Sequence, residues 1–174
     1  MLKRAFLLIA MITGFSFVVS AQVGPRHYEN GGRYSICPPA TWRVQSFAPS
    51  PNKIFVGPVE NNHTTLMVFT NHRSGLNENE TFSEYVLSIS FIHSLTLKNY
   101  KYNNVSVFVT DNGLEGLKLD YTYEQDNNDI QAYSYFFIFP DGRIIDITCG
   151  NARISGNKFE KQFDESAKTL EPIN

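Results

Sequence analysis

Three short turn signals divide the second half of the chain into four apolar stretches. The signals are Asp111-Asn112-Gly113, Asp126-Asn127-Asn128-Asp129 and Pro140-Asp141-Gly142. Asn, Asp and Gly tolerate the positive φ angles of tight hairpin turns. Strands that are joined by such short connections must lie beside each other in antiparallel order. The sequence therefore predicts a four-stranded antiparallel meander over residues 105–149.

Two stretches of this meander predict which faces are buried. The one between the first two turns alternates between apolar and polar residues, as expected of a strand with one face in water. Its apolar members are Leu117, Leu119, Tyr121 and Tyr123, and its polar members are Lys118, Asp120, Thr122 and Glu124. The next stretch, 131–139, is aromatic or apolar on both faces apart from Ser134. We expect part of it to lie under a helix and part, namely Tyr133, Tyr135 and Phe137, to border a partner-binding surface.

Two segments are predicted to be helical. Thr81-Phe82-Ser83-Glu84 has the sequence of a capping box, in which Thr81 and Glu84 satisfy the first exposed backbone donors. Apolar residues follow at helical spacing to about Lys98 and form one stripe. They are Phe82, Tyr85, Val86, Ile89, Ile92 and Leu95. A second helix is predicted over about 156–170, with Phe159, Phe163, Ala167 and Leu170 as its apolar stripe.

The first half of the chain adds short β-branched runs at about 33–37, 42–47, 53–57 and 64–70, separated by prolines and polar residues. Two amphipathic helices and a sheet can bury their apolar faces only by packing together. The predicted fold is therefore α+β, with a curved antiparallel sheet of about six to seven strands packed between helices. Residues 33–174 form one domain, and the Gly- and Pro-containing segment 22–32 is expected to be a flexible lead-in.

Composition narrows the class of protein. The 174 residues are 42% hydrophobic and 18% charged, with a formal net charge of −2. This length fits one domain, and the apolar content is too high for a disordered chain. The balanced charge excludes a basic nucleic-acid-binding chain.

The N-terminus predicts export. Lys3 and Arg4 precede the apolar run 5–19, and Val19-Ser20-Ala21 supplies the small residues that signal peptidase requires. This is the layout of a secretory signal peptide, with cleavage after Ala21. The alternative is a membrane anchor, but the run is shorter than the roughly 20 apolar residues that a spanning helix needs. We expect a secreted or periplasmic protein with no stable membrane span after cleavage.

Two cysteines, Cys37 and Cys149, remain in the mature chain. Exported proteins meet oxidising conditions, so an isolated pair favours a disulfide that ties the first strand to the last. The alternative is two buried thiols that act as small apolar side chains.

The order of these elements resembles the PsbP-like family, which is named for an extrinsic subunit of photosystem II. The resemblance rests on Tyr34-Ser35-Ile36-Cys37-Pro38-Pro39-Ala40-Thr41-Trp42, the strands around Phe55 and Met67, the helix after Glu80, the meander with Gly142-Arg143-Ile144, and the terminal helix with Phe159 and Phe163. It covers nearly all of residues 33–171, and the two cysteines depart from it.

The resemblance implies an α/β/α sandwich that is shared with a Ran-binding nuclear import factor. Members of the family are mostly non-enzymatic accessory or assembly proteins that dock on larger complexes, and some bind metal. Fold analogy does not transfer the photosynthetic role.

No catalytic motif is present in the sequence. The four histidines, His27, His63, His72 and His93, lack zinc-ligand spacing and are interpreted as surface residues. Asp126-Asn127-Asn128-Asp129 lacks the glycine and final glutamate of an EF-hand loop and is interpreted as a turn. No cofactor or metal is expected.

Three functional hypotheses follow. The first is an exported, non-enzymatic binding module that docks on another protein or an envelope complex. The second is a secreted hydrolase whose site is built from loops. The third, with less support, is a metal-dependent binding protein that uses histidines and turn carboxylates.

Overall fold

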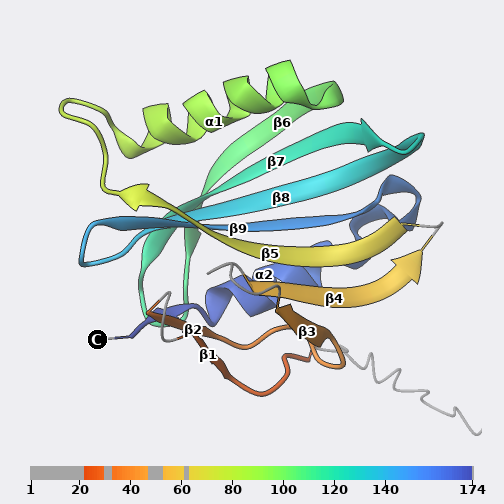
Figure 1. The fold of residues 1–174 in the computed structure, drawn as a ribbon, viewed down its shortest axis with the longest axis horizontal. Helices are drawn as coiled ribbons and strands as arrows, with labels where there is room; N and C mark the ends of the chain where they lie inside the picture. The colour runs from red at the N-terminus through yellow and green to blue at the C-terminus, as the bar shows by residue number, and fades with distance from the viewer. Residues whose placement is uncertain (1–21, 30–32, 47–52, 61–62, 174) are drawn as a thin grey trace, which may run out of the picture.

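An antiparallel sheet of seven strands forms the centre of the computed structural model, which describes residues 22–29, 33–46, 53–60 and 63–173 (Figure 1). The strand order is β3-β4-β5-β9-β8-β7-β6. The bounds are β3 (Arg43–Ser46), β4 (Lys53–Glu60), β5 (His63–Ser74), β6 (Lys98–Val109), β7 (Glu115–Gln125), β8 (Asn128–Ile138) and β9 (Arg143–Ala152). The predicted signal peptide and its cleavage after Ala21 lie outside the described residues.

The meander from β6 to β9 is as predicted. Neighbours in the chain are neighbours in the sheet and pair antiparallel. The Gly113 N–H donates to the Thr110 carbonyl at 3.0 Å, and the Gly142 N–H donates to the Phe139 carbonyl at 2.8 Å. Asp126 and Asn127 close the middle turn with φ angles of 51° and 62°. These turns therefore determine the topology of four of the seven strands.

One helix covers each face of this sheet, as the α+β prediction requires. Helix α1 (Phe82–Thr96) packs on the face that carries Phe136, and its Tyr85 ring lies 6.3 Å from that ring. Helix α2 (Glu160–Lys168) packs on the opposite face, where Phe163 lies 6.1 Å from Tyr133. A strand turns successive side chains to opposite faces, so β8 contributes to both cores. The aromatic stretch is explained by this double burial.

The capping box that the sequence predicts is formed at the start of α1. The Glu84 N–H donates to Thr81 Oγ1 at 3.2 Å, and the Thr81 N–H donates to Glu84 Oε2 at 2.8 Å. The second predicted helix is divided in two. A 3-10 helix, η1 (Arg153–Lys158), precedes α2, and Phe159 lies between them.

A second, three-stranded sheet lies on the α2 side of the molecule (Figure 1). It consists of β1 (His27–Glu29), β2 (Tyr34–Ile36) and β10 (Glu171–Pro172), with β2 in the middle. Residues 22–29 of the predicted flexible lead-in are thus part of the fold. Val23 forms a bridge with Pro39, and Arg26 forms an ion pair with Glu171 at 3.0 Å. Backbone pairing within the described residues therefore begins before residue 33.

The predicted disulfide is not found, because Cys37 and Cys149 are both free in the structure. Cys37 follows β2 in the small sheet, where its backbone bonds to Ser166 and Thr169 near the end of α2. Cys149 lies on β9 of the large sheet and is fully buried. The disulfide was predicted to tie the first strand to the last, and in the structure the strands next to these cysteines, β2 and β9, belong to different sheets. Within the described residues, no helix is long and apolar enough to cross a membrane.

Candidate functional surfaces

The aromatic strand β8 is core and not a surface. Tyr133, Tyr135 and Phe137, which the sequence placed at a partner-binding surface, are buried. Phe163 of α2 packs against Tyr133, and Phe108 of β6 packs edge-on against Tyr135 and Phe137. The prediction was wrong because α2 and β6 together cover the face that seemed open.

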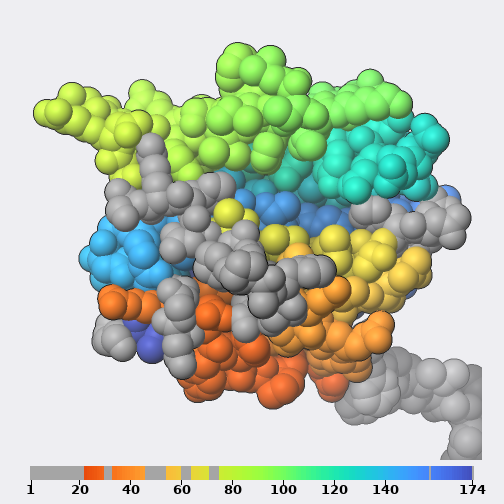
Figure 2. All heavy atoms as spheres, viewed as in Figure 1, coloured from red at the N-terminus to blue at the C-terminus, as the bar shows by residue number. Residues whose placement is uncertain are grey.

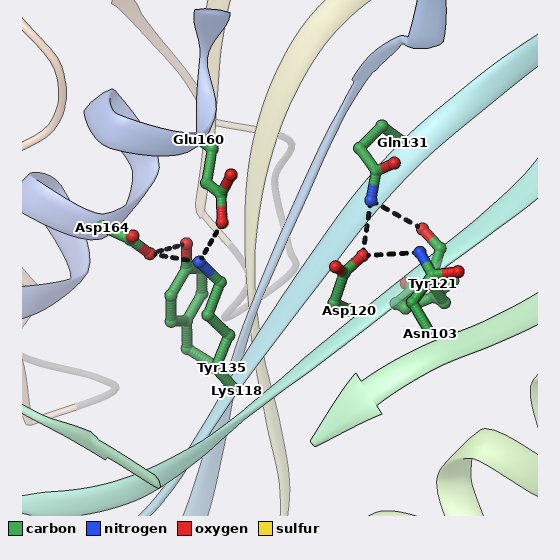
Figure 3. Close-up of polar contacts among 8 residues, drawn as sticks. All are labelled: Asn103, Lys118, Asp120, Tyr121, Gln131, Tyr135, Glu160 and Asp164. Atoms are coloured by element: carbon green, nitrogen blue, oxygen red, sulfur yellow. Dashed lines mark hydrogen bonds and ion pairs between the residues drawn. The ribbon is translucent and has the colours of Figure 1, made fainter. Parts of the chain in front are cut away.

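A charged cluster attaches α2 to the sheet (Figure 3). Lys118 Nζ lies 2.9 Å from Glu160 Oε1 and 2.7 Å from Asp164 Oδ1. The same ammonium lies 4.6 Å from the centre of the Tyr133 ring, and its side chain is only 11% exposed. The Tyr135 hydroxyl donates to Asp164 Oδ1 at 2.7 Å. The sequence placed Lys118 on a wet face, but the cluster turns it into an internal cation.

The two phenols of this cluster are kept neutral. Burial, and secondarily nearby carboxylates or the Cys149 thiol, raise the pKa of Tyr133 and Tyr135 well above the ordinary value. A neutral phenol can donate a hydrogen bond and cannot act as a nucleophile or base near neutral pH. The hydrogen bond and the ion pairs of the cluster therefore fix α2 to the sheet.

A more exposed polar group continues along the same face of the sheet (Figure 3). Asp120 Oδ1 accepts hydrogen bonds from Asn103 Nδ2 at 2.9 Å and from Gln131 Nε2. An open cavity of about 450 Å³ is lined by other residues of β6, β7 and β8, together with Arg153. Arg153 lies 3.9 Å from Asp129 in this lining. Charges of both signs therefore face the cavity: Lys101 and Arg153 are basic, and Asp129 is acidic.

The third hypothesis, a metal-dependent binding protein, requires metal-ligating side chains that lie close together. In the part of the chain that the structure describes, no three His, Cys, Asp or Glu side chains are grouped to hold a metal ion. The His93 ring lies 5.1 Å from the Tyr121 ring, and the His27 ring lies 5.6 Å from the Phe55 ring. Both are half-buried aromatic contacts and not the surface residues that the sequence predicted. The side chains of His63 and His72 lie outside what the structure describes.

A row of hydroxyl groups crosses the α1 face of the sheet. The Tyr121 hydroxyl lies 3.4 Å from Ser134 Oγ, Ser134 Oγ lies 2.9 Å from Thr148 Oγ1, and Thr148 Oγ1 donates to Asp146 Oδ2 at 2.9 Å. The chain thus places serine, threonine and aspartate side chains in hydrogen-bonded series. Ser134 is fully buried. The row therefore links the neighbouring strands β7, β8 and β9 through side-chain hydrogen bonds.

The outer face of α1 is the largest departure from the sequence prediction. Four apolar side chains point away from the sheet: Leu87 is 49% exposed, Phe91 64%, Ile92 50% and Leu95 70%. The predicted stripe included Ile92 and Leu95 as core residues. In the structure, the buried side is carried by Tyr85, Val86 and Ser90. We refer to Leu87, Phe91, Ile92 and Leu95 as the outer α1 face.

Few polar groups near this face would lose hydrogen bonds to water if another molecule covered it. No charged residue occurs from Tyr85 to Leu97. The hydroxyls of Ser88, Ser94 and Thr96 donate to the carbonyls of Tyr85, Phe91 and Ile92 within the helix. Because these hydroxyls are already paired, covering the face would leave few unsatisfied polar atoms. Figure 2 shows α1 as a ridge in green along one edge of the molecule. The absence of charge over thirteen residues is the sequence signal that could have identified this face.

Comparison with models of known protein families gives no match, and no curated protein matches the sequence. Solved structures do match. The Pseudomonas aeruginosa protein PA94, of unknown function, has a TM-score of 0.59 at 16% identity, over 88% of this chain and 99% of that one.

Two further structures relate the fold to proteins with described roles. Cyanobacterial PsbP from Synechocystis has a TM-score of 0.57 at 14% identity, over 93% of this chain and 99% of that one. LpqN of Mycobacterium tuberculosis, involved in cell envelope biogenesis, has a TM-score of 0.62 at 10% identity, over 87% and 86%. At these identities the likeness concerns the fold alone, and the chain has a PsbP-like α+β fold.

Proposed function

We propose that the protein is an exported, non-enzymatic accessory module that docks on another protein of the cell envelope through the outer α1 face. The observation that carries the proposal is the exposure of Leu87, Phe91, Ile92 and Leu95 on a helix without charged residues. Contiguous exposed apolar side chains of this kind mark interaction sites more often than chance positions do. The fold itself does not require them, since α1 already packs through its other side.

Two further observations support export and accessory function. The Gln22 carbonyl accepts a hydrogen bond from the Ala40 N–H at 2.9 Å, so cleavage after Ala21 would keep this contact within the mature protein. The structural neighbours include a PsbP and a protein involved in cell envelope biogenesis. The expected mature N-terminus is Gln22, which N-terminal sequencing of the exported protein checks.

Site-specific crosslinking in intact cells tests the docking surface. A photo-crosslinking residue at Phe91 or Leu95 should yield the same single envelope protein. Lys161, which is exposed on α2 at the opposite side of the sheet, is the matched control position and should yield none. The charged substitution Leu87→Glu should abolish the crosslink from position 91. Equal crosslinking from positions 91 and 161, or persistence in the Leu87→Glu protein, would contradict the proposal.

A further inference from the structure

We infer that a second copy of this chain covers the outer α1 face when the docking partner is absent, through antiparallel pairing of α1 with α1 around a two-fold axis at Phe91. The inference rests on the proposed docking role of this face and adds its regulation. A two-fold interface uses the same patch on both copies, so the patch must complement itself. The outer α1 face meets this condition in both its apolar residues and its charges.

The apolar residues are symmetric about Phe91. Leu87 and Leu95 lie four residues before and after it, which places all three on one face of the helix. In an antiparallel pair with Phe91 on the axis, Leu87 of one copy lies opposite Leu95 of the other. A large side chain then faces a large side chain at each level, and the paired serine and threonine hydroxyls leave little polar surface to desolvate.

The charges are complementary only in the antiparallel orientation. Glu78, Glu80 and Glu84 lie at the start of α1, and Lys98 and Lys101 follow its end. Glu84 lies in the first turn of α1, and Lys98 directly follows its C-cap, so antiparallel pairing brings the acidic end of one copy toward the basic end of the other. Lys98 also contacts Glu124 of its own chain, but its side chain is 66% exposed and accessible to a second carboxylate. Parallel pairing would bring like charges together at both ends.

The same charge distribution disfavours an anionic lipid surface as the occupant. An interfacial helix that binds anionic lipid carries basic residues on its polar face. Here one end of α1 is acidic, and this end would be repelled.

The small area of the face makes the dimer weak and displaceable. Four side chains of this size, half to two-thirds exposed, bury on the order of 800 Å² over two copies, below the area of a standard specific interface. An envelope partner with a larger contact area would therefore displace the second copy. The dimer would be the form that protects the apolar face after export.

Sedimentation velocity of the exported, signal-free protein tests self-association. The wild-type protein should shift from monomer to dimer as its concentration rises. Phe91→Glu should raise the dissociation constant more than about tenfold, because a carboxylate would be buried among apolar side chains. The control is Val107→Glu, since Val107 is an equally exposed apolar residue on β6. A wild-type protein that stays monomeric, or equal effects of the two substitutions, overturns the inference.

Cysteine crosslinking tests the orientation. In a Cys37→Ser background, a mixture of Leu87→Cys and Leu95→Cys proteins should form mixed disulfide dimers on mild oxidation. Each protein alone should crosslink more slowly. Faster crosslinking of each protein with itself would indicate a parallel pair and overturn the inference.

Failure of this inference and failure of the proposed function give different results. A protein that is monomeric in solution but crosslinks to one envelope protein from Phe91 overturns the dimer and leaves the docking role. A protein that dimerises through α1 but yields no envelope crosslink overturns the docking role alone. A monomer that co-sediments with vesicles of anionic phospholipid, and loses this with Phe91→Glu, overturns both in favour of a lipid surface.

Discussion

The two helices lie on opposite faces of one sheet and use their surfaces in opposite ways (Figure 1). Helix α2 buries Phe163 and Ala167 completely and exposes the charged Lys161 on its outer side. Helix α1 buries Tyr85 and Val86 and still exposes four large apolar side chains. The sheet needs one apolar face from each helix, and α1 offers two. The surplus face of α1 is therefore available for another molecule, whereas α2 has no such face.

The difference extends to the polar contacts of each helix. Lys118 and the Tyr135 hydroxyl of the sheet both contact Asp164 and so attach α2 to the sheet. On the α1 side, Ser90 Oγ lies 2.5 Å from the Tyr100 hydroxyl of β6. Helix α2 is thus fastened by charge as well as by apolar packing. Helix α1 is held to the sheet by apolar packing and by this uncharged hydroxyl contact.

The strongest test of this comparison removes one phenyl ring from each helix. Phe163→Ala should lower the free energy of unfolding by about 3–5 kcal/mol, because it opens a cavity under α2. Phe91→Ala should change it by less than about 0.5 kcal/mol, because the ring lies in water. Urea denaturation of the two proteins measures both effects at a concentration where the chain is monomeric. A comparable loss in the two proteins would show that the outer α1 face contributes to folding.

The charged attachment of α2 gives a smaller effect. Lys118→Met keeps the apolar stem but leaves Asp164 and Glu160 without their cation, and it should cost about 1–3 kcal/mol. The carboxylates are partly exposed, which limits the loss. Lys161→Met on the exposed side of α2 is the control and should be nearly neutral. A double-mutant cycle with Asp164→Asn should give a coupling energy that differs from zero, and additivity would refute the attachment.

The capping box should make the α1 side sensitive to acid. Hydrogen bonds from the Thr81 backbone and hydroxyl lower the pKa of Glu84 below its ordinary value of 4.5. A lowered pKa in the folded state means that the stabilisation is complete above about pH 4.5 and is lost as the pH falls through the folded pKa. Glu84→Gln should remove this pH dependence while keeping an acceptor for the Thr81 N–H. The measurement is the thermal unfolding temperature of both proteins between about pH 3 and 6. If this temperature depends on pH equally in the two proteins, the prediction is wrong.

The smallest effect concerns the two thiols on the α2 side. Burial raises the pKa of the Cys149 thiol well above its ordinary value, so little reactive thiolate exists there. Native alkylation at neutral pH should modify the half-buried Cys37 first and Cys149 only on unfolding. Mass spectrometry without reductant distinguishes this from the disulfide predicted from the sequence. A bridge formed during export would leave both cysteines unmodified even in denaturant.

The sequence predicted the features that depend on local chemistry. The turns at Gly113 and Gly142 need residues with a particular backbone freedom, and the start of α1 needs the pair Thr81 and Glu84. These signals lie within four residues, and the structure confirms each of them. The first half of β6, from Lys98 to Asn104, was missed because its asparagines and lysines have no apolar alternation. It is a strand because β7 supplies its hydrogen-bond partners.

The candidate surface could not be predicted in the same way. An apolar residue looks the same in a sequence whether it is buried or exposed, so Ile92 was placed in the core and Tyr133 on a surface. Exposure depends on which element covers each face. The pairing of β6 with β7 and the seating of α2 decide this from residues more than twenty positions away.

The sequence by itself determined the strand order of the meander, the helix start at Thr81, the α+β class and the exclusion of a basic nucleic-acid-binding chain. These follow from backbone preferences and composition, which act over short distances. Only the tertiary structure decided that residues 22–29 belong to the fold, that Lys118 is internal, and that α1 has an unused apolar face. The physical reason is that burial is a property of the packed layers: a side chain leaves water only when a distant segment covers it.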